Sequence, residues 1–278
     1  LTGGSAGREG ASIQFGGSIG NWLGKLAHLD EFDHHVMIMC GMSAAFAAVF
    51  GTPMAAAVFA MEVVSVGVMY YAALLPCVIA AIIAAEFATG MGIDPETFPV
   101  HSIPGLTVES GLKMALIAVG CGILSILFCI LLKTVGQLYA KYLKNPYIRI
   151  VVAAGVIILI TICLNTKDYM GAGSGLIARA IEKGEARPLD FLWKMLLTAL
   201  TMRAGYRGGE IVPAFSIGAT FGCVAGGILG FSPELAAAAS MVALFCGVTN
   251  CPITAMLISF ELFGFSGAAY YLIAISIS

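Results

Sequence analysis

The sequence has 278 residues, of which 59% are hydrophobic and only 11% are charged, and its mean hydropathy is +0.96. Because soluble globular domains carry about 25% charged residues, this composition excludes an ordinary soluble domain and predicts an integral membrane protein. The formal net charge of −2 offers no basic surface, so nucleic acid is excluded as a partner.

The first motif in chain order is the glycine turn GREG at residues 7–10, which leads into an apolar stretch. We expect a helix to begin here, and the first N–H groups of a helix, at the positive end of its dipole, bind anions. Glu9 can occupy that place as a tethered anion, and protonation would release it. We therefore predict a gating or proton-carrying role for Glu9, with Gly10 in the anion site and Arg8 as an accessory residue. The alternatives are a plain helix-start glutamate at the membrane surface and, for Arg8, a loop or interface charge.

A polar stretch, HLDEFDHH, follows at residues 28–35, and we predict a solvated turn there. His34 and His35 stand beside the acidic residues Asp30, Glu31 and Asp33, so a metal site is the alternative. Eight cysteines lie mostly in apolar runs without a CxxC motif, which favours simple packing over metal or redox chemistry. We predict neither a metal nor a cofactor.

Three apolar stretches are long enough to cross a membrane, at residues 70–88, 112–132 and 148–164. Since helices satisfy their own backbone in lipid, the predicted fold class is an all-α polytopic membrane protein. Residues 133–149 hold four basic residues and no acidic one, which predicts a cytoplasmic loop.

Two further apolar stretches, residues 37–64 and 236–262, are each interrupted by a proline that predicts a break between two short helices. Pro252 follows Pro53 by 199 residues, and Glu261 follows Glu62 by the same interval. The symmetry favours a structural role for these two glutamates. The chain therefore contains two structural repeats, which we place at residues 1–110 and 111–278 within one membrane domain. Paired broken helices are typical of transporters.

The second repeat has its own glutamate turn, GGEIVPAFSIGATFG, at residues 208–222. Pro213 suits the first turn of a helix. We expect the backbone N–H groups of Glu210, Ile211 and Val212 to form the second half of an anion site, with Phe215 as an accessory residue.

Together these motifs resemble the CLC chloride channel and transporter family. GREGASIQFGG is similar to its GREGP signature, GTPMAAAVFAMEV to the segment that follows, and GGEIVPAFSIGATFG to its second anion-binding loop. The resemblance implies a homodimer of inverted-repeat subunits with broken, tilted helices, each with its own anion pathway. It also implies that Glu9 is the gating glutamate.

The branch of the family follows from single positions. Val63 stands where proton-coupled chloride exchangers carry a second glutamate, and chloride channels and fluoride/proton antiporters both lack it. GGE resembles the bacterial fluoride branch, whereas Ala11 and Val212 depart from the usual residues. We predict proton-coupled halide antiport, with fluoride favoured over chloride; the alternative is a passive chloride channel. An intramembrane enzyme is disfavoured, since the chain has no HExxH motif and no recognisable nucleophile.

The remaining expectations concern the whole protein. The chain opens inside a glycine loop and stops within an apolar run, so we expect a piece of a longer protein whose other anion ligands lie before residue 1 and after residue 278. We expect a multi-pass protein of the bacterial plasma membrane, with halide anions, protons, the lipid bilayer and a second subunit as its partners.

Overall fold

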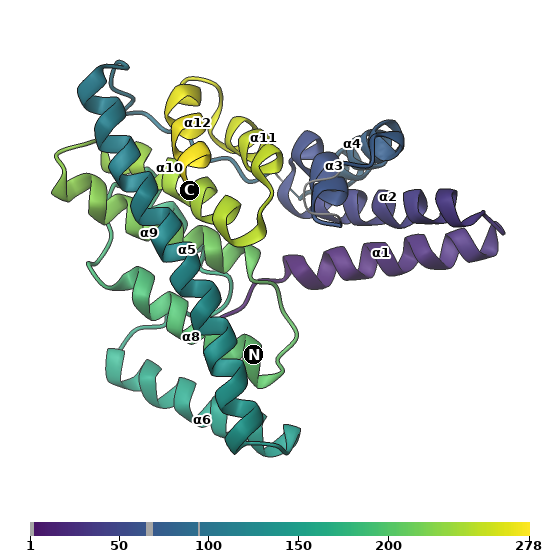
Figure 1. Ribbon diagram of the computed structural model, residues 1–278, viewed down its shortest axis with the longest axis horizontal. Helices are drawn as coiled ribbons and strands as arrows, with labels where there is room; N and C mark the ends of the chain where they lie inside the picture. Colours follow the sequence, from purple (N-terminus) through teal and green to yellow (C-terminus); the bar gives the residue numbers. More distant parts are fainter. Residues whose placement is uncertain (1–2, 65–68, 94) are drawn as a thin grey trace. The chain divides into compact units, whose positions relative to one another are not determined.

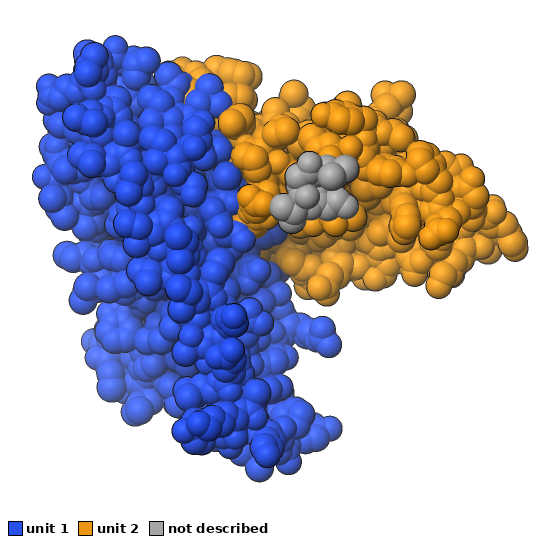
Figure 2. All heavy atoms as spheres, in the orientation of Figure 1, with its two compact units in different colours: residues 1–8, 100–248, 269–278 blue, residues 9–99, 249–268 orange. Residues whose placement is uncertain are grey.

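The computed structural model describes residues 3–64, 69–93 and 95–278, and these fold into twelve α-helices and one 3-10 helix (Figure 1). The chain divides into two compact units, coloured separately in Figure 2. Unit 1 comprises Leu1–Arg8, Val100–Val248 and Ala269–Ser278, and unit 2 comprises Glu9–Pro99 and Thr249–Ala268. Each unit thus combines segments that are far apart in the sequence. The predicted boundary at residue 110 separates repeated sequence motifs rather than compact units. The division into units does not test it, so it stays a prediction.

Unit 2 contains five α-helices and the 3-10 helix: α1 (Glu9–Leu26), α2 (Glu31–Phe50), α3 (Pro53–Glu62), η1 (Tyr71–Ala73), α4 (Leu74–Gly90) and α11 (Pro252–Phe263). The Asp30 side chain caps α2 by accepting a hydrogen bond from the Asp33 N–H at 2.8 Å. The polar stretch at residues 28–35 is therefore a turn only up to Asp30; residues 31–35, with His34 and His35, belong to the first turns of α2. A capping aspartate followed by acidic residues is a helix-start signal, which explains this correction.

Glycines bring α1 and α2 into close backbone contact. A Cβ atom at Gly16 would overlap the carbonyl oxygen of Gly41, and a Cβ at Gly41 would overlap the carbonyl oxygen of Gly16. One turn further along α1, a Cβ at Gly20 would overlap the carbonyl oxygen of Met37. Small residues at such a crossing let helices approach where lipid supplies no hydrophobic drive between them.

Unit 1 contains seven α-helices: α5 (Val108–Tyr142), α6 (Pro146–Leu164), α7 (Ser174–Glu182), α8 (Asp190–Ala204), α9 (Ile211–Ile228), α10 (Pro233–Thr249) and α12 (Ala268–Ile277). The main hydrophobic core of this unit lies where α5, α8 and α9 meet, with Phe128, Ala199 and Ile217 wholly buried. Most side chains of α9 and α10 are buried. These two helices form the interior against which the second glutamate turn is built.

The predicted loop at residues 133–149 is wrong, since α5 runs unbroken to Tyr142 and only residues 143–145 separate it from α6. The residues from Lys133 onward are mostly good helix formers, and a single glycine at position 136 costs a helix only about 1 kcal/mol. The helix ends just before Asn145, whose side chain caps α6 by accepting from the Tyr147 N–H.

Both predicted helix breaks are confirmed. In the first, α2 ends at Phe50, Gly51 adopts a left-handed conformation, and α3 begins at Pro53. In the second, α10 ends at Thr249, Asn250 has a positive φ of 56°, and α11 begins at Pro252. Proline suits the first helical position because its missing N–H would have no partner within the helix there.

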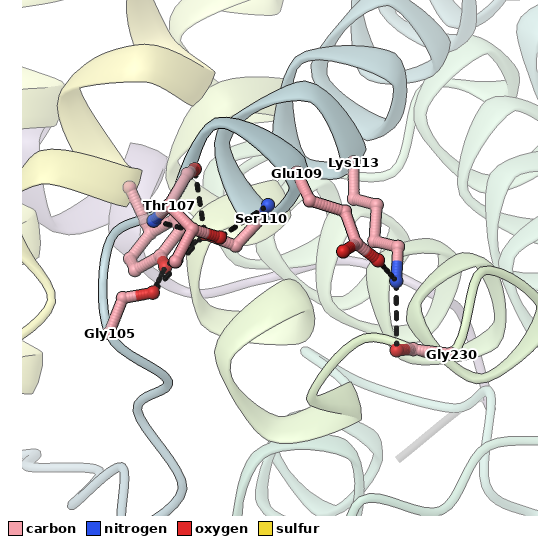
Figure 3. Close-up of polar contacts among 7 residues, drawn as sticks. Gly105, Thr107, Glu109, Ser110, Lys113 and Gly230 are labelled. Carbon is pink, nitrogen blue, oxygen red and sulfur yellow. Dashed lines mark hydrogen bonds and ion pairs between the residues drawn. The ribbon is translucent and has the colours of Figure 1, made fainter.

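The start of α5 is joined to two other parts of unit 1 (Figure 3). Thr107 and Ser110 form a capping box, and the Tyr270 hydroxyl of α12 lies within hydrogen-bond distance of Ser110 Oγ at 2.9 Å. Lys113 pairs with Glu109 at 2.8 Å and also reaches the carbonyl oxygen of Gly230, in the link between α9 and α10. These contacts tie α5, α9 and α12 together at one end of α5.

Five helices of the described residues are long and apolar enough to cross a membrane: Glu31–Phe50, Tyr71–Gly90, Val108–Tyr142, Pro146–Leu164 and Ile211–Ile228. The predicted spans 112–132 and 148–164 fall within the third and fourth of these, and the predicted span 70–88 matches the second except for Tyr70, which precedes it. All three are confirmed as apolar helical segments, and the second consists of η1 followed directly by α4. Only 11% of the apolar window of α6 is buried, which suits a helix whose side chains face lipid.

Replacing Gly41 with alanine should force α1 and α2 apart. We expect the G41A variant to lose roughly 1–3 kcal/mol of stability, the usual cost of overpacking. Thermal unfolding in detergent, followed by loss of the monodisperse chromatographic peak, measures this effect. Gly155 on α6 is the matched control, because a Cβ there meets nothing within 4 Å, so G155A should be neutral or slightly stabilising. Equal unfolding midpoints for the two variants would contradict the close approach.

Candidate functional site

The two glycine turns are paired through their backbones. The N–H of Gly7 donates to the carbonyl oxygen of Gly209 at 2.9 Å, and the N–H of Gly209 donates back to Gly7 at 2.7 Å. Both residues are buried and belong to unit 1. Gly208 must lack a side chain, since a Cβ there would come within 2.7 Å of the Ala6 Cβ. Two segments about 200 residues apart in the sequence are therefore held as neighbours just before their glutamates.

The first turn leads directly into a helix, as predicted. Glu9 is the first residue of α1 and only 4% of its surface is exposed, whereas Arg8 is exposed and Gly10 is half-buried. Burying a carboxylate is costly unless its surroundings stabilise the charge or it takes up a proton. The side chain is therefore not exposed, while the gating role and the alternative of a helix-start glutamate at the membrane surface both stay predictions.

The second turn starts α9. Glu210 is the N-cap residue and half-buried, and its side chain does not cap the helix. Ile211 and Val212 form the first turn with 7% and 5% of their surfaces exposed, so the N–H groups at this helix end lie in an apolar setting. Phe215 is buried against Phe245, with ring centroids 5.2 Å apart. It supports α9 from within unit 1, and no contact in the described residues assigns it to an ion.

The two symmetric glutamates of unit 2 are helix caps: Glu62 caps the start of α11, and Glu261 caps the start of α3. Glu62, at the end of α3, accepts from the N–H groups of Ile253 and Thr254 at 3.1 and 2.9 Å and from the Thr254 hydroxyl at 2.7 Å. Glu261, on α11, accepts from the N–H groups of Met54 and Ala55, both at 2.9 Å. Each carboxylate thus occupies the anion-binding start of the helix that follows the other break. The predicted structural role of both residues is confirmed.

The glycine segment that precedes Gly7 also borders a cavity. A cavity of about 450 Å³ in unit 1 is lined by residues on either side of the pairing, including Ala6 and Arg207. Arg207 is exposed and stands three residues before Glu210. A larger surface cavity, of about 800 Å³, lies at the start of α5 and is lined by His101, Lys113 and Phe231 among others. It contains none of the residues predicted to bind ions.

The metal alternative at residues 28–35 finds no support. Within the described ranges, no three His, Cys, Asp or Glu side chains come together in a way that could hold a metal. Asp30 is used as a helix cap, and His34 Nε2 lies 3.1 Å from the carbonyl oxygen of Asn21. All eight cysteines are free thiols.

Sequence reasoning missed the polar side chains that hold the first glycine segment. The Ser5 N–H donates to the Thr201 hydroxyl oxygen at 3.0 Å, and the Ser5 and Thr198 hydroxyls are 3.0 Å apart. A signal was available: Lys194, Thr198 and Thr201 recur at helical spacing within an apolar helix. This spacing did not lead to a prediction, because small hydroxyl residues are common in membrane helices.

A comparison with protein families decides the identity of this fold. The family described as voltage gated chloride channel matches residues 1–278, the full length of the sequence. The chain belongs to the voltage-gated chloride channel family. Its all-helical membrane fold with broken helices is the CLC fold that the motifs led us to expect.

Relatives within this family are named as channels or transporters. The chain is 33% identical to a chloride/fluoride channel protein of Pseudomonas syringae pv. tomato, over 95% of this chain and 60% of the relative. It is 28% identical to the H(+)/Cl(-) exchange transporter ClcA of Vibrio cholerae, over 92% of this chain and 58% of the relative. The chain therefore spans about 60% of the length of these relatives.

Solved structures agree on the fold. A CLC-type fluoride/proton antiporter is 33% identical and superposes with a TM-score of 0.94, over 99% of this chain and 69% of that chain. A slow cyanobacterial Cl-/H+ antiporter is 19% identical with a TM-score of 0.80, over 99% of this chain and 68% of that chain, and it supports the fold alone.

The reciprocal caps predict a loss of stability on neutralisation. In the E261Q variant, the amide retains one acceptor but turns an NH2 group toward a helix N–H, so we expect a loss of roughly 1–2 kcal/mol. Thermal unfolding in detergent measures it. Glu109 is the control because its pair with Lys113 is at the surface, with 78% of the Glu109 side chain exposed, and such pairs contribute little. An E261Q variant no less stable than E109Q would contradict the capping role.

Proposed function

We propose that this chain forms part of a proton-coupled halide antiporter of the CLC family, with fluoride favoured over chloride. The observation that carries the proposal is the two-way pairing of Gly7 with Gly209. It ties together the backbones that enter the two glutamate turns, one leading to Glu9 and the other to Glu210. Paired helix starts from duplicated halves are the arrangement in which transporters bind anions.

Helix starts supply the chemistry for the anion. The N–H groups of Ile211 and Val212 stand at the positive end of the α9 dipole, in apolar surroundings where a hydrogen bond to an anion is strong. In the first glutamate turn, we propose that the backbone of Gly10 likewise binds the anion. A small anion held by such groups gives up its hydration water in exchange for fixed dipoles, with no full positive charge to trap it.

Glu9 supplies the coupling. Its carboxylate begins α1 and is buried, so it competes with a free anion for the helix-start donors while it is charged. Protonation removes its negative charge and with it that competition. If each cycle needs one exchange of this kind, a proton moving one way is linked to an anion moving the other. Glu210, next to the second helix start, tunes the site toward a small, hard anion or assists the proton.

Relatives support the choice of ion and of mechanism. The 33% identical relative from Pseudomonas is named for chloride and fluoride, and the 33% identical solved structure is a fluoride/proton antiporter. By analogy with these proteins we propose a homodimer in a bacterial plasma membrane that carries out transport rather than catalysis. Arg8 attracts anions to the pathway in this proposal, since it is exposed beside Glu9.

A passive chloride channel is the second candidate, and Val63 motivates it. Proton-coupled chloride exchangers of the family carry a second glutamate at this position, whereas chloride channels and fluoride/proton antiporters both lack it, so the valine argues against a chloride exchanger and leaves the channel as the competitor of the fluoride antiporter. The two candidates differ in one measurable respect: an antiporter is driven by a pH gradient, and a channel is not.

The E9Q variant tests the coupling in proteoliposomes of the full-length protein. A gradient of one pH unit stores about 1.4 kcal/mol per proton, enough for about a tenfold anion gradient at one proton per anion. We expect wild-type protein to accumulate fluoride against its gradient and E9Q to lose this uphill transport. E109Q, at the protein surface, is the control and should behave as wild type.

Fluoride and chloride are to be compared in the same vesicles, with proton uptake recorded simultaneously. Uphill fluoride transport that survives in E9Q would reject the role of Glu9. Reversal potentials that ignore the pH gradient would favour the channel, and equal efflux of both ions would reject the fluoride preference.

A further inference from the structure

A buried polar stripe runs along α8. Lys194, Thr198 and Thr201 are spaced by four and three residues, which places them on one face of the helix. None of the three is more than 1% exposed. Burying an ammonium group and two hydroxyls in a membrane protein is costly unless each finds partners, so their contacts indicate what the stripe does.

Lys194 holds the loop between α6 and α7. Its Nζ donates to the carbonyl oxygens of Gly171 and Tyr169 at 2.7 and 3.1 Å. The next turn of this loop is fixed from α9, where the Ser216 hydroxyl is within 3.1 Å of the carbonyl oxygens of Ala172 and Gly173. Gly173 must be glycine, because it has a φ of 90° and a Cβ there would overlap Ser216 Oγ and lie 2.9 Å from Lys194 Cε.

The loop in turn holds the glycine segment that precedes the first turn. The N–H of Gly171 donates to the carbonyl oxygen of Gly4 at 2.8 Å. The two threonines of the stripe bind the next residue, Ser5. Thr201 accepts from the Ser5 N–H, and the Thr198 hydroxyl lies within hydrogen-bond distance of the Ser5 hydroxyl. Thr201 donates its own hydroxyl proton to the carbonyl oxygen of Leu197 at 2.7 Å, which leaves its oxygen oriented to accept from Ser5.

A continuous set of hydrogen bonds therefore runs from Lys194 through Gly171 to Gly4. Three residues after Gly4, Gly7 pairs with Gly209. All of these residues belong to unit 1. The stripe on α8 thus fixes both segments at the points where they enter the two glutamate turns.

We propose that Lys194 is a positioning residue for the ion pathway: by holding the Gly171 carbonyl it fixes the Gly4–Gly7 segment and, through Gly209, the start of α9. This inference rests on the proposed function for its transport consequences but concerns a separate set of residues. An ammonium group fits the task because it has three N–H donors and no acceptor, so one nitrogen can bind two carbonyl oxygens at once. A neutral apolar side chain would leave both oxygens buried without this donor.

A second cation, from α7, binds the same loop and provides a matched control. Arg179 on α7 binds Asp168 at 3.0 Å, three residues before Gly171, and Arg187 lies 3.7 Å from the same carboxylate. Burial acts to raise the pKa of Asp168, but the hydrogen bonds from Arg179 and Thr166 outweigh it and hold this pKa below its ordinary value. Arg179 therefore restrains the loop without touching the bonds that lead to Gly4.

The test compares K194M with R179Q, each of which removes one cation that binds this loop. Hydrogen–deuterium exchange of the full-length protein in detergent reports on the backbone directly. We expect exchange in peptides covering residues 3–9 and 205–211 to accelerate at least tenfold in K194M and to stay within twofold of wild type in R179Q. In proteoliposomes, K194M should lower the maximal anion flux at least tenfold and shift its pH profile, which general loosening of the loop in R179Q should not do.

T201V keeps the test decisive if K194M does not fold. This variant preserves the shape of the side chain but removes the acceptor of the Ser5 N–H, so faster exchange at residues 3–9 and a lower flux are expected. Exchange at both turns that is the same in K194M and R179Q, or a T201V protein that behaves as wild type, would overturn the proposal. Because exchange is measured without transport, absence of uphill anion movement in the wild type would reject the antiporter and leave the positioning role to be judged on exchange alone.

Discussion

The backbone pairing of Gly7 with Gly209 is the constraint on which the candidate site depends. These two hydrogen bonds join the segments that lead into two glutamate turns about 200 residues apart in the sequence. The pairing requires glycine at the crossing, because a side chain at Gly208 would collide with Ala6. A helix starts within two residues of each paired glycine, so the constraint acts directly on the groups able to bind an anion.

Helix starts inside an apolar protein are used in two different ways here. In unit 2, Glu62 and Glu261 fill the starts of α11 and α3 permanently, each with hydrogen bonds of 2.7–3.1 Å. At the start of α9, the Glu210 side chain does not cap the helix. The same physical property, donors at the positive end of a helix dipole, therefore serves structure in unit 2 and, in the proposed function, binds the anion at the start of α9.

Burial of polar groups links the two proposals. A membrane protein can bury a lysine or a glutamate only where partners repay the lost hydration. Lys194 finds carbonyl oxygens in the loop beside the glycine segment, and Thr198 and Thr201 bind Ser5. In the proposed transport role, support of this kind gives the glycine segment the rigidity that ion selection needs, because glycine by itself imposes little on the backbone.

The sequence by itself determined the membrane class, both proline breaks, the glutamate turns and the family, because each depends on composition, on proline and glycine or on short motifs. The prediction of a loop at residues 133–149 was wrong, because it rested on the basic residues although most residues there favour a helix. Only the tertiary structure decided which helix starts Glu62 and Glu261 cap, that Gly7 pairs with Gly209, and that Lys194 reaches Gly171. These are contacts between residues distant in the chain, and local pattern carries no information on which distant partner a side chain meets.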